Sequence, residues 1–261
     1  MKLPGYNGNE RIIRLQGAHN FRDLGGYATQ NGRMTAKGKL FRSGALAKLT
    51  EEDHKIIRML GIRAIYDLRA TEERKRRPSI LPQNMVIEML GRDYAESAGN
   101  LLTKMAAPSG TAEKSRQLMI DTYRVLAYEQ AASYRELFLR VADGALPLLF
   151  HCSVGKDRTG IAAALLLELL GVPRATIIED YLLTDLFFEE GLDIVLNALG
   201  TTALHGVSPE IWAPLLRADG IYLETMFETL EARHGSVFGY LHEVLGLDDA
   251  IQERLRTRLC A

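Results

Sequence analysis

The fold of this chain is decided by residues 146–171, which read LPLLFHCSVGKDRTGIAAALLLELLG. The first part of this stretch, Leu146–Phe150, is a short apolar run that is typical of a strand buried inside a sheet. The last part, Ile161–Leu170, is apolar over a helical length and is followed by Gly171, which can form a left-handed C-terminal cap. The residues between them, His151–Gly160, are therefore expected to form a loop that joins a buried strand to a buried helix.

The sequence before this stretch alternates further strands with helices. Strands are predicted at Arg11–Leu15, Lys39–Arg42, Ala64–Tyr66 and Met85–Leu90. A helix is predicted to begin after Thr50, a suitable N-cap with Asp53 three residues later, and to end before Gly61. Glu113–Ala142 has helical periodicity and is predicted to form two helices that are broken near Tyr128.

The residues after Gly171 are helical in pattern almost to the end of the chain. Strands that alternate with helices, followed by helices alone, predict an α/β fold in which a central, mostly parallel sheet is flanked by helices and has a helical C-terminal cover. We expect residues 1–261 to form a single domain. Residues 91–130 include Gly99, Pro108 and Gly110 and are expected to contain a lid or insertion.

The composition is that of an ordinary globular protein. The 261 residues are 47% hydrophobic and 25% charged, with a formal net charge of −1, which argues against a protein that coats nucleic acid. The two cysteines, Cys152 and Cys260, lie far apart, which suits a reducing compartment rather than a disulfide scaffold. The first residues show no apolar signal-peptide region, and the longest apolar run is too short to cross a bilayer. We expect a cytoplasmic chain without integral membrane association, while export without a signal peptide and peripheral membrane contact stay open.

Five residues separate Cys152 from Arg158 in the predicted loop. A loop of this length can curl so that its amides converge on one point, and the following helix adds its own unpaired N–H groups and its positive dipole end. An anion of the size of phosphate fits such a cradle. The amides of the loop run from Ser153 through Val154, Gly155 and Lys156 to Arg158.

Four loop residues suit phosphoryl transfer to sulfur. Cys152 would lie at the floor of the cradle, where the same donors favour the thiolate, which is the nucleophilic form. The planar guanidinium of Arg158 can bind two phosphate oxygens, a geometry that lysine cannot reproduce. Gly155 allows the backbone to approach the ligand closely, and the Thr159 hydroxyl can donate a hydrogen bond to the sulfur when it becomes a leaving group.

Two other interpretations explain less of the loop. A buried cysteine on a strand that merely precedes a helix does not explain the Gly-Lys-Asp-Arg-Thr-Gly run that follows it. A Walker-type nucleotide loop is suggested by Gly155 and Lys156, but Phe150 stands where the first glycine should be, and Asp157 replaces the Ser or Thr that would hold magnesium. Kinases and ATPases of that design are therefore excluded.

The loop HCSVGKDRTG resembles the signature loop of the atypical bacterial tyrosine phosphatases that also act on phosphoinositides. Further blocks resemble that family in the right order, namely Asn20–Tyr27, Leu40–Leu46, and Asp67–Arg69 with Glu72. The resemblance implies a cysteine-phosphatase fold of the dual-specificity type. It also implies two-step hydrolysis through a phosphocysteine, without metal or other cofactor, in which Cys152 attacks phosphorus while Arg158 and the loop amides hold the phosphate oxygens.

The leaving group needs a proton from a carboxylic acid near the phosphate, and two candidates stay open. Asp157 lies inside the loop. Asp67 ends a strand at the sheet edge where open α/β folds place their sites, and it is slightly preferred as the acid, with Asp157 positioning groups or assisting the water. The alternative for Asp67 is an ion pair with Arg69 or Arg22.

Basic residues near the loop are candidates for substrate binding. Lys156 adds a cation at the mouth of the site, which suits a substrate with further phosphates, and a solvated side chain fits the sequence equally well. Arg22 is expected to bind substrate or to buttress the site from the N-terminal block. The basic run Arg74–Arg77 is more typical of a solvated face than of a contact with an acidic headgroup or phosphopeptide.

These residues predict a phosphatase for phosphate monoesters, namely phosphotyrosine and, beyond it, phosphoserine, phosphothreonine or phosphoinositides. Its partners would be a phosphorylated protein or a phosphoinositide substrate. The main alternative is a pseudophosphatase that binds a phosphorylated partner without turnover, but Cys152, Arg158 and both acid candidates are present. Sulfur transfer or arsenate reduction is a third hypothesis, which the lack of a second cysteine near Cys152 disfavours.

Overall fold

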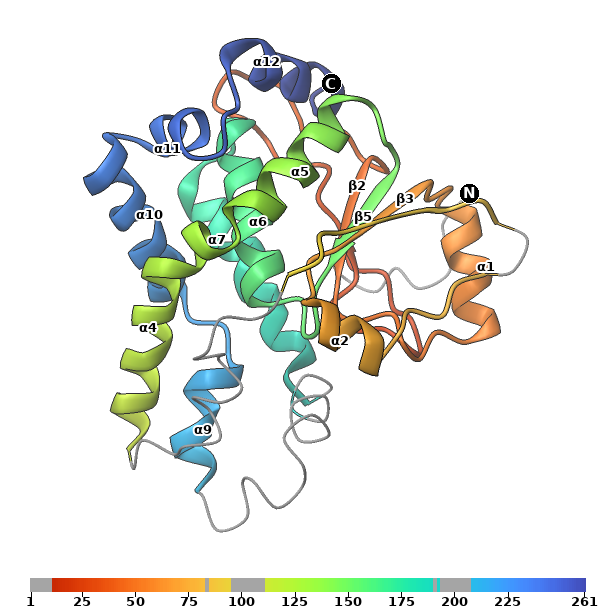
Figure 1. Ribbon diagram of the computed structural model, residues 1–261, viewed down its shortest axis with the longest axis horizontal. Coiled ribbons are helices and arrows are strands. Elements are labelled where there is room, and N and C mark those ends of the chain that lie inside the picture. The colour runs from red at the N-terminus through yellow and green to blue at the C-terminus, as the bar shows by residue number, and fades with distance from the viewer. Residues whose placement is uncertain (1–10, 83–84, 95–110, 190–191, 193–207) are drawn as a thin grey trace.

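The structure is a computed structural model that describes residues 11–82, 85–94, 111–189, 192 and 208–261. A five-stranded sheet runs through its centre (Figure 1). The strands lie in the order β1 (Arg22–Asp23), β2 (Leu40–Ser43), β5 (Leu148–His151), β3 (Ala64–Asp67) and β4 (Glu88–Leu90). Only β1 pairs antiparallel, and the other neighbours are parallel, which confirms the predicted central, mostly parallel sheet.

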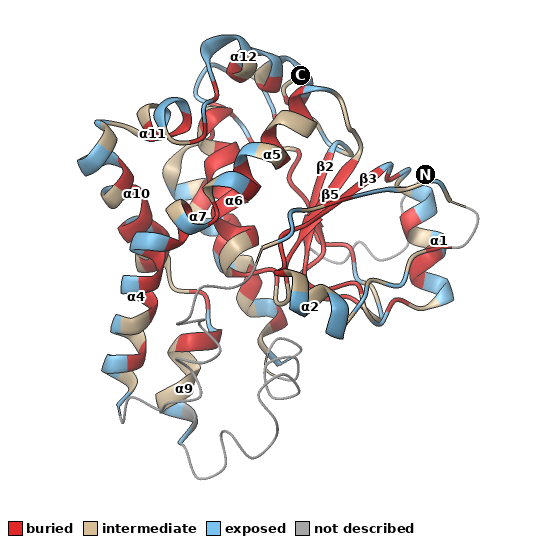
Figure 2. Cartoon of the chain, in the orientation of Figure 1, coloured by how far each residue is buried: buried red, intermediate tan, exposed pale blue. Residues whose placement is uncertain are grey.

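The sheet separates two hydrophobic cores, because successive side chains of a strand point to opposite faces. In β5, Leu148 and Phe150 belong to the larger core, whereas Leu149 belongs to the smaller one. Helix α6 (Asp157–Leu169) fills the larger core and is buried along nearly its whole length (Figure 2). Helix α1 (Glu51–Met59) covers the other face through Ile57.

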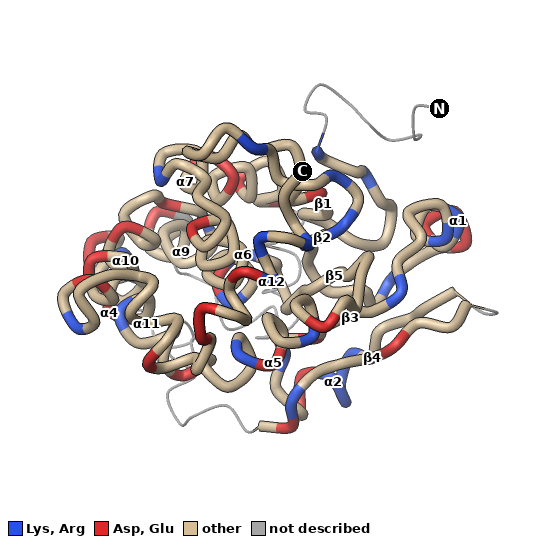
Figure 3. Tube along the Cα trace, turned by 90° about the horizontal axis from the view of Figure 1, so that it is seen from above, with Lys and Arg blue, Asp and Glu red and all other residues tan. Residues whose placement is uncertain are grey.

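Further helices follow α1 along the chain, and those after α6 form the predicted helical C-terminal cover. They are α2 (Thr71–Arg76), α4 (Ala112–Glu129), α5 (Ala131–Ala142), α7 (Arg174–Leu182), the 3-10 helix η1 (Leu183–Phe187), α9 (Pro209–Leu216), α10 (Gly220–His234), α11 (Val237–Glu243) and α12 (Asp249–Leu259). Acidic and basic positions are interspersed over the described chain (Figure 3). Within the described residues, none of these helices combines the length and the apolar character that a bilayer span needs.

Local sequence signals place the elements well. The Thr50 hydroxyl oxygen accepts a hydrogen bond from the Asp53 amide, and the Asp53 carboxylate accepts one from the Thr50 amide, which confirms the predicted start of α1. The break between α4 and α5 falls at Gln130, close to the expected position near Tyr128. The predicted strand Arg11–Leu15 is reduced to an isolated bridge from Ile12, because its partner β1 is only two residues long.

The segment 91–130, expected to hold a lid or insertion, is described only in part, since 95–110 lie outside the described residues. Its second half is helix α4, which places Met119, Tyr123, Leu126 and Ala127 in the main core and packs against α9 and α10. This part of the segment is therefore a core helix, and the expected lid or insertion stays a prediction.

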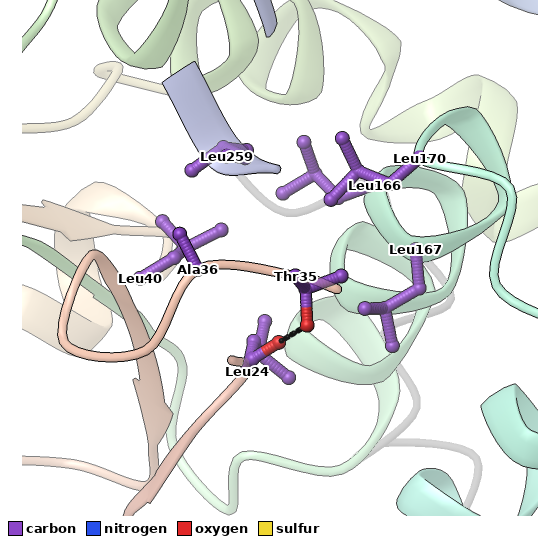
Figure 4. Close-up of a pocket in the computed structure, with 8 residues that line it drawn as sticks. All are labelled: Leu24, Thr35, Ala36, Leu40, Leu166, Leu167, Leu170 and Leu259. Atoms are coloured by element: carbon purple, nitrogen blue, oxygen red, sulfur yellow. Dashed lines mark hydrogen bonds between the residues drawn. The ribbon is translucent and has the colours of Figure 1, made fainter. Parts of the chain in front are cut away.

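A small apolar cavity lies at the C-terminal end of α6. It is lined by Leu24, Thr35, Ala36, Leu40, Leu166, Leu167, Leu170 and Leu259 (Figure 4). Its one polar side chain is satisfied, because the Thr35 hydroxyl donates to the Leu24 carbonyl at 3.0 Å. The cavity is at the opposite end of α6 from Cys152, so it is a packing gap rather than a substrate site.

Candidate active site

The loop from Cys152 to Lys156 connects the central strand β5 to the first turn of α6. It lies at the carboxyl ends of the parallel strands, beside helix α2 (Figure 1). The expected strand, loop and helix therefore occur in the predicted order, at the sheet edge where open α/β folds bind ligands.

The loop carbonyls are turned outward by the two N-terminal sequence blocks. Their donors are the Ala45 amide to Ser153 O at 3.0 Å, His19 Nε2 to Val154 O at 3.1 Å, and Asn20 Nδ2 and Arg42 Nη2 to Gly155 O at 2.9 and 2.8 Å. In a trans peptide the N–H points away from the C=O, so the amides that follow these carbonyls face the opposite side. The Gly155 amide accordingly donates to Cys152 Sγ at 3.3 Å.

Position 155 can hold only glycine without a shift of the surrounding backbone. Gly155 has φ +76°, and a Cβ there would lie 2.6 Å from the Ser43 carbonyl oxygen and 2.7 Å from the Gly44 nitrogen. The backbone of the loop therefore packs directly against the backbone at the end of strand β2. The close approach that glycine permits here is to strand β2 on the outer side of the loop, and the expected approach to the ligand stays a prediction.

A buried ion network supports the loop from behind. The Asp180 carboxylate on α7 pairs with Arg22 Nε at 2.9 Å and with Arg42 Nη1 at 2.8 Å, and all three side chains are essentially inaccessible to solvent. Burial alone would raise the pKa of Asp180, but the two guanidinium groups outweigh it and lower the pKa to about 2. The same network carries the Arg42 hydrogen bond to Gly155, so it positions the loop directly.

Arg158 is held by a carboxylate from helix α2. Its Nη1 and Nη2 lie 2.6 and 2.9 Å from the two oxygens of Glu73, which also accepts the Ser153 hydroxyl at 2.6 Å. Burial would raise the pKa of Glu73, but the charge of Arg158 holds that pKa well below its usual range. Glu73 also accepts the Ala70 amide at 2.9 Å, so the residue that orients Arg158 also caps α2.

A model of the tyrosine phosphatase family matches residues 13–261 of this chain. The chain belongs to this family. A tyrosine-protein phosphatase candidate of Cupriavidus necator is 33% identical over 235 residues, covering 88% of this chain and 83% of that protein. The triple specificity protein phosphatase PtpB of Mycobacterium tuberculosis is 30% identical over 276 residues, covering 94% of this chain and 98% of that protein. The core catalytic domain of the PP-IP phosphatase SIW14 from S. cerevisiae is 14% identical, with a TM-score of 0.36 over 66% of this chain and 78% of that chain.

In this member of the tyrosine phosphatase family, the structure brings five of the predicted site residues together. Cys152, Ser153, Val154 and Gly155 form the loop, and Arg158 is the second residue of α6. The side chain of Thr159 is fully buried, and its hydroxyl has no hydrogen-bond partner in the part of the chain that the structure describes. That unpaired donor fits the expected role toward the sulfur of the loop.

Asp67 is placed differently from the preferred prediction. Both its oxygens bind the guanidinium of Arg69, at 2.6 Å for Asp67 Oδ2 to Nη2 and 2.9 Å for Oδ1 to Nε. Burial favours the neutral form, but His151 and Arg69 together lower the pKa of Asp67 below its ordinary value. A carboxylate that is buried, paired and hard to protonate is poorly suited to give a proton to a leaving group, so this placement favours the ion-pair alternative, and the identity of the acid stays a prediction.

Lys156 and Arg22 are also corrected. Lys156 is buried rather than at the mouth of the site, and its Nζ donates to the Leu215 carbonyl of α9 at 2.6 Å. Arg22 lies in the buried network with Asp180, behind the loop, so it buttresses the site and does not reach substrate. For Arg22 this agrees with the buttressing alternative, whereas the pairing of Lys156 was not foreseen because a sequence shows a charge but not the element that pairs with it.

Several site residues were missed from the sequence. Glu72 was singled out in the Asp-Leu-Arg block, but it is exposed and pairs with Lys75, whereas Glu73 reaches Arg158. The available signal was the capping position of Glu73, three residues after Ala70, which turns its carboxylate toward the loop. Tyr123 and Asp180 gave no local signal, because their contacts cross more than thirty residues.

Substitution of Asp67 by Asn is expected to lower the free energy of unfolding by about 3 kcal/mol, because the buried Arg69 guanidinium loses its counter-charge. The folded pKa of Asp67 is depressed, so its contribution is present above the ordinary carboxyl pKa and is lost as the pH falls through the folded value. Urea unfolding at neutral and acid pH measures this, and the two proteins should begin to converge in stability as the pH falls below about 4. Asp93→Asn, at an exposed pair with Arg74, is the control, and equal effects of both substitutions would contradict the interpretation.

Proposed function

We propose that this tyrosine phosphatase family member hydrolyses phosphate monoesters through a covalent phosphocysteine at Cys152. The observation that carries the proposal is the outward hydrogen bonding of three consecutive loop carbonyls, which directs the amides that follow them toward the space above the sulfur. Those amides, the dipole of α6 and Arg158 together supply the charge that a phosphoryl group needs.

In the first step, the Cys152 thiolate attacks phosphorus and the bond from phosphorus to the leaving oxygen breaks. The Asp157 carboxylic acid gives its proton to that oxygen, so the product leaves as an alcohol or phenol. Asp157 is the first residue of α6 and its side chain is 17% exposed, which places it between the buried loop and solvent. Arg158 binds the oxygens of the phosphoryl group while Glu73 keeps its guanidinium in place.

In the second step, a water molecule attacks phosphorus, the Asp157 carboxylate takes a proton from that water, and the phosphorus–sulfur bond breaks. Inorganic phosphate and the Cys152 thiolate are the products, so atoms and charge balance over the cycle. The Gly155 amide, which already donates to Cys152 Sγ, stabilises the leaving thiolate, and we assign the second donation to the Thr159 hydroxyl, which is buried and without a partner among the described residues.

The substrate range proposed here follows the family and the name of the M. tuberculosis relative, which is described as a triple specificity phosphatase. We propose phosphotyrosine as the first substrate, with phosphoserine, phosphothreonine and phosphoinositides as further ones. An active phosphatase is preferred to a pseudophosphatase because the chain keeps Cys152, Arg158 and Asp157, the residues that turnover needs.

The test is phosphate release from a panel of phosphotyrosine peptide, phosphoserine peptide and phosphoinositide, combined with an acid quench during turnover. We expect the quenched protein to carry one phosphoryl group on the tryptic peptide that contains Cys152, found by mass spectrometry. Cys152→Ser should bind the same substrates and release no phosphate. Binding without turnover by the unsubstituted chain would support the pseudophosphatase instead, and activity retained by Cys152→Ser would refute the covalent mechanism.

A further inference from the structure

We propose that Tyr123 is a positioning residue that decides which oxygen of Asp157 carries the catalytic proton. This inference rests on the proposed function, because it takes Asp157 as the general acid. Tyr123 belongs to α4, is fully buried, and places its hydroxyl 2.9 Å from Asp157 Oδ1. No other described side-chain hydroxyl contacts this carboxylate.

The direction of this hydrogen bond follows from counting protons. The Tyr123 hydroxyl also lies 2.8 Å from the Tyr181 hydroxyl of α7, and each hydroxyl carries one proton. Burial raises the pKa of both phenols well above the usual value, so both remain donors. Tyr123 gives its proton to Asp157 Oδ1 and therefore accepts from Tyr181, which makes a directed chain from Tyr181 to Tyr123 to Asp157.

This chain leaves only one oxygen of Asp157 for the acid proton. Oδ1 already accepts from Tyr123 and lies 3.4 Å from Lys156 Nζ, so a proton placed on Oδ1 would oppose both groups. In the part of the chain that the structure describes, Oδ2 accepts no hydrogen bond. The acid form of Asp157 therefore holds its proton on Oδ2, and the anion formed after transfer is stabilised at Oδ1.

The ring of Tyr123 is fixed by contacts from two other helices. Its centroid lies 6.2 Å from the Tyr181 ring in an edge arrangement and 5.5 Å from the Tyr222 ring of α10. A Cβ on Gly160 of α6 would lie only 3.0 Å from the Tyr181 ring, so glycine at that position admits the ring against α6. Helices α4, α7 and α10 together thus hold the Tyr123 hydroxyl against Asp157 of α6.

Tyr123→Phe removes the hydroxyl and keeps the ring, which makes it the direct test. Loss of a hydrogen bond to a group that becomes charged should lower kcat about tenfold for phenyl phosphate, whose leaving group needs the proton. For p-nitrophenyl phosphate, whose leaving group departs as an anion, the change should be less than twofold. The inhibition constant of orthovanadate should not change, because the phosphate cradle is intact.

Tyr222→Phe is the matched control, since it removes a hydroxyl from the same ring cluster that donates to the Pro214 carbonyl and not to Asp157. It should leave the ratio of the two kcat values unchanged. An equal loss of kcat for both substrates in Tyr123→Phe, or no loss, would overturn the positioning role. If Tyr123→Phe does not fold, Tyr181→Phe takes its place, and it must lower kcat selectively for phenyl phosphate, by about threefold for loss of the weaker, neutral hydrogen bond.

The same two substrates separate this inference from the proposed function. Asp157→Asn should also lower kcat selectively for phenyl phosphate. If it does so while Tyr123→Phe does not, only the positioning role fails. If Asp157→Asn shows no dependence on the leaving group, the assignment of Asp157 as the acid fails with it.

Discussion

Substitution of Asp180 by Asn is expected to lower the free energy of unfolding by about 3–5 kcal/mol, the usual loss when one partner of a buried ion pair is removed. Two fully buried guanidinium groups, Arg22 and Arg42, would then share no negative charge. Burial and the neighbouring Arg22 lower the pKa of Arg42 to about 10, and the charge of Asp180 opposes this lowering. Without Asp180 the charged form of Arg42 would therefore be less stable still. Urea unfolding measures the change.

The same substitution should reduce phosphate-release activity by roughly 100-fold, because small displacements of reacting groups have effects of that size. Arg42 binds both Asp180 and the Gly155 carbonyl, so loss of one contact releases the other. Tyr27→Phe offers a milder change, since the Tyr27 hydroxyl donates to Asp180 at 2.8 Å and its loss costs about 1 kcal/mol. Activity should fall in the order of the unsubstituted chain, Tyr27→Phe and Asp180→Asn.

The effect of Asp180 on stability should depend on pH with a defined sign. Its folded pKa of about 2 lies below the ordinary carboxyl value, so the stabilisation is fully present above about pH 4 and disappears as the pH falls toward 2. The unsubstituted chain and Asp180→Asn should therefore converge in acid. Asp121→Asn, at an exposed pair on α4, is the control and should show no such convergence. A loss below 1 kcal/mol at neutral pH in Asp180→Asn would contradict the role given to this network.

The sequence predicted well whatever depends on neighbouring residues. Thr50 and Asp53 mark the start of α1 because a capping box is made within four residues. The loop before α6 was recognised because only five residues separate Cys152 from Arg158, so the pattern is visible within a short stretch of sequence. In the same way, apolar runs placed β3 and β5, and alternation along these strands divides the two cores.

The parts of the site that the sequence did not predict depend on distant partners. Asp67 was preferred as the acid because strand ends meet at one sheet edge. At that edge, however, the side chain of Arg69 pairs with the Asp67 carboxylate. Lys156 is buried because the carbonyls at the end of α9, about sixty residues away, accept its ammonium group. Tyr123 could not be distinguished from other core aromatics, since its hydroxyl gains a role only when α4 packs against α6. In each case a charge or hydroxyl was visible and its partner was not.

Of the two acid candidates, Asp157 is expected to affect catalysis more than Asp67 when it is replaced by Asn. General acid catalysis contributes about 100- to 10,000-fold, so kcat for phenyl phosphate should fall by that range. With p-nitrophenyl phosphate the loss should be below about tenfold, because a good leaving group needs little protonation. Steady-state rates for a series of aryl phosphates measure this as a steeper dependence of kcat on the acidity of the leaving phenol.

The pH profile gives a second and independent readout of the same substitution. A general acid must be protonated, so the rate of the unsubstituted chain should fall at high pH, and that fall should vanish in Asp157→Asn. Asp67→Asn is the matched control, because it makes the same chemical change at a carboxylate that is paired with Arg69. Its basic limb and its leaving-group dependence should stay as they are. The opposite pattern, with Asp67→Asn losing the basic limb and Asp157→Asn keeping it, would mean that the Asp67 and Arg69 pair opens when substrate binds and that the acid comes from β3 after all.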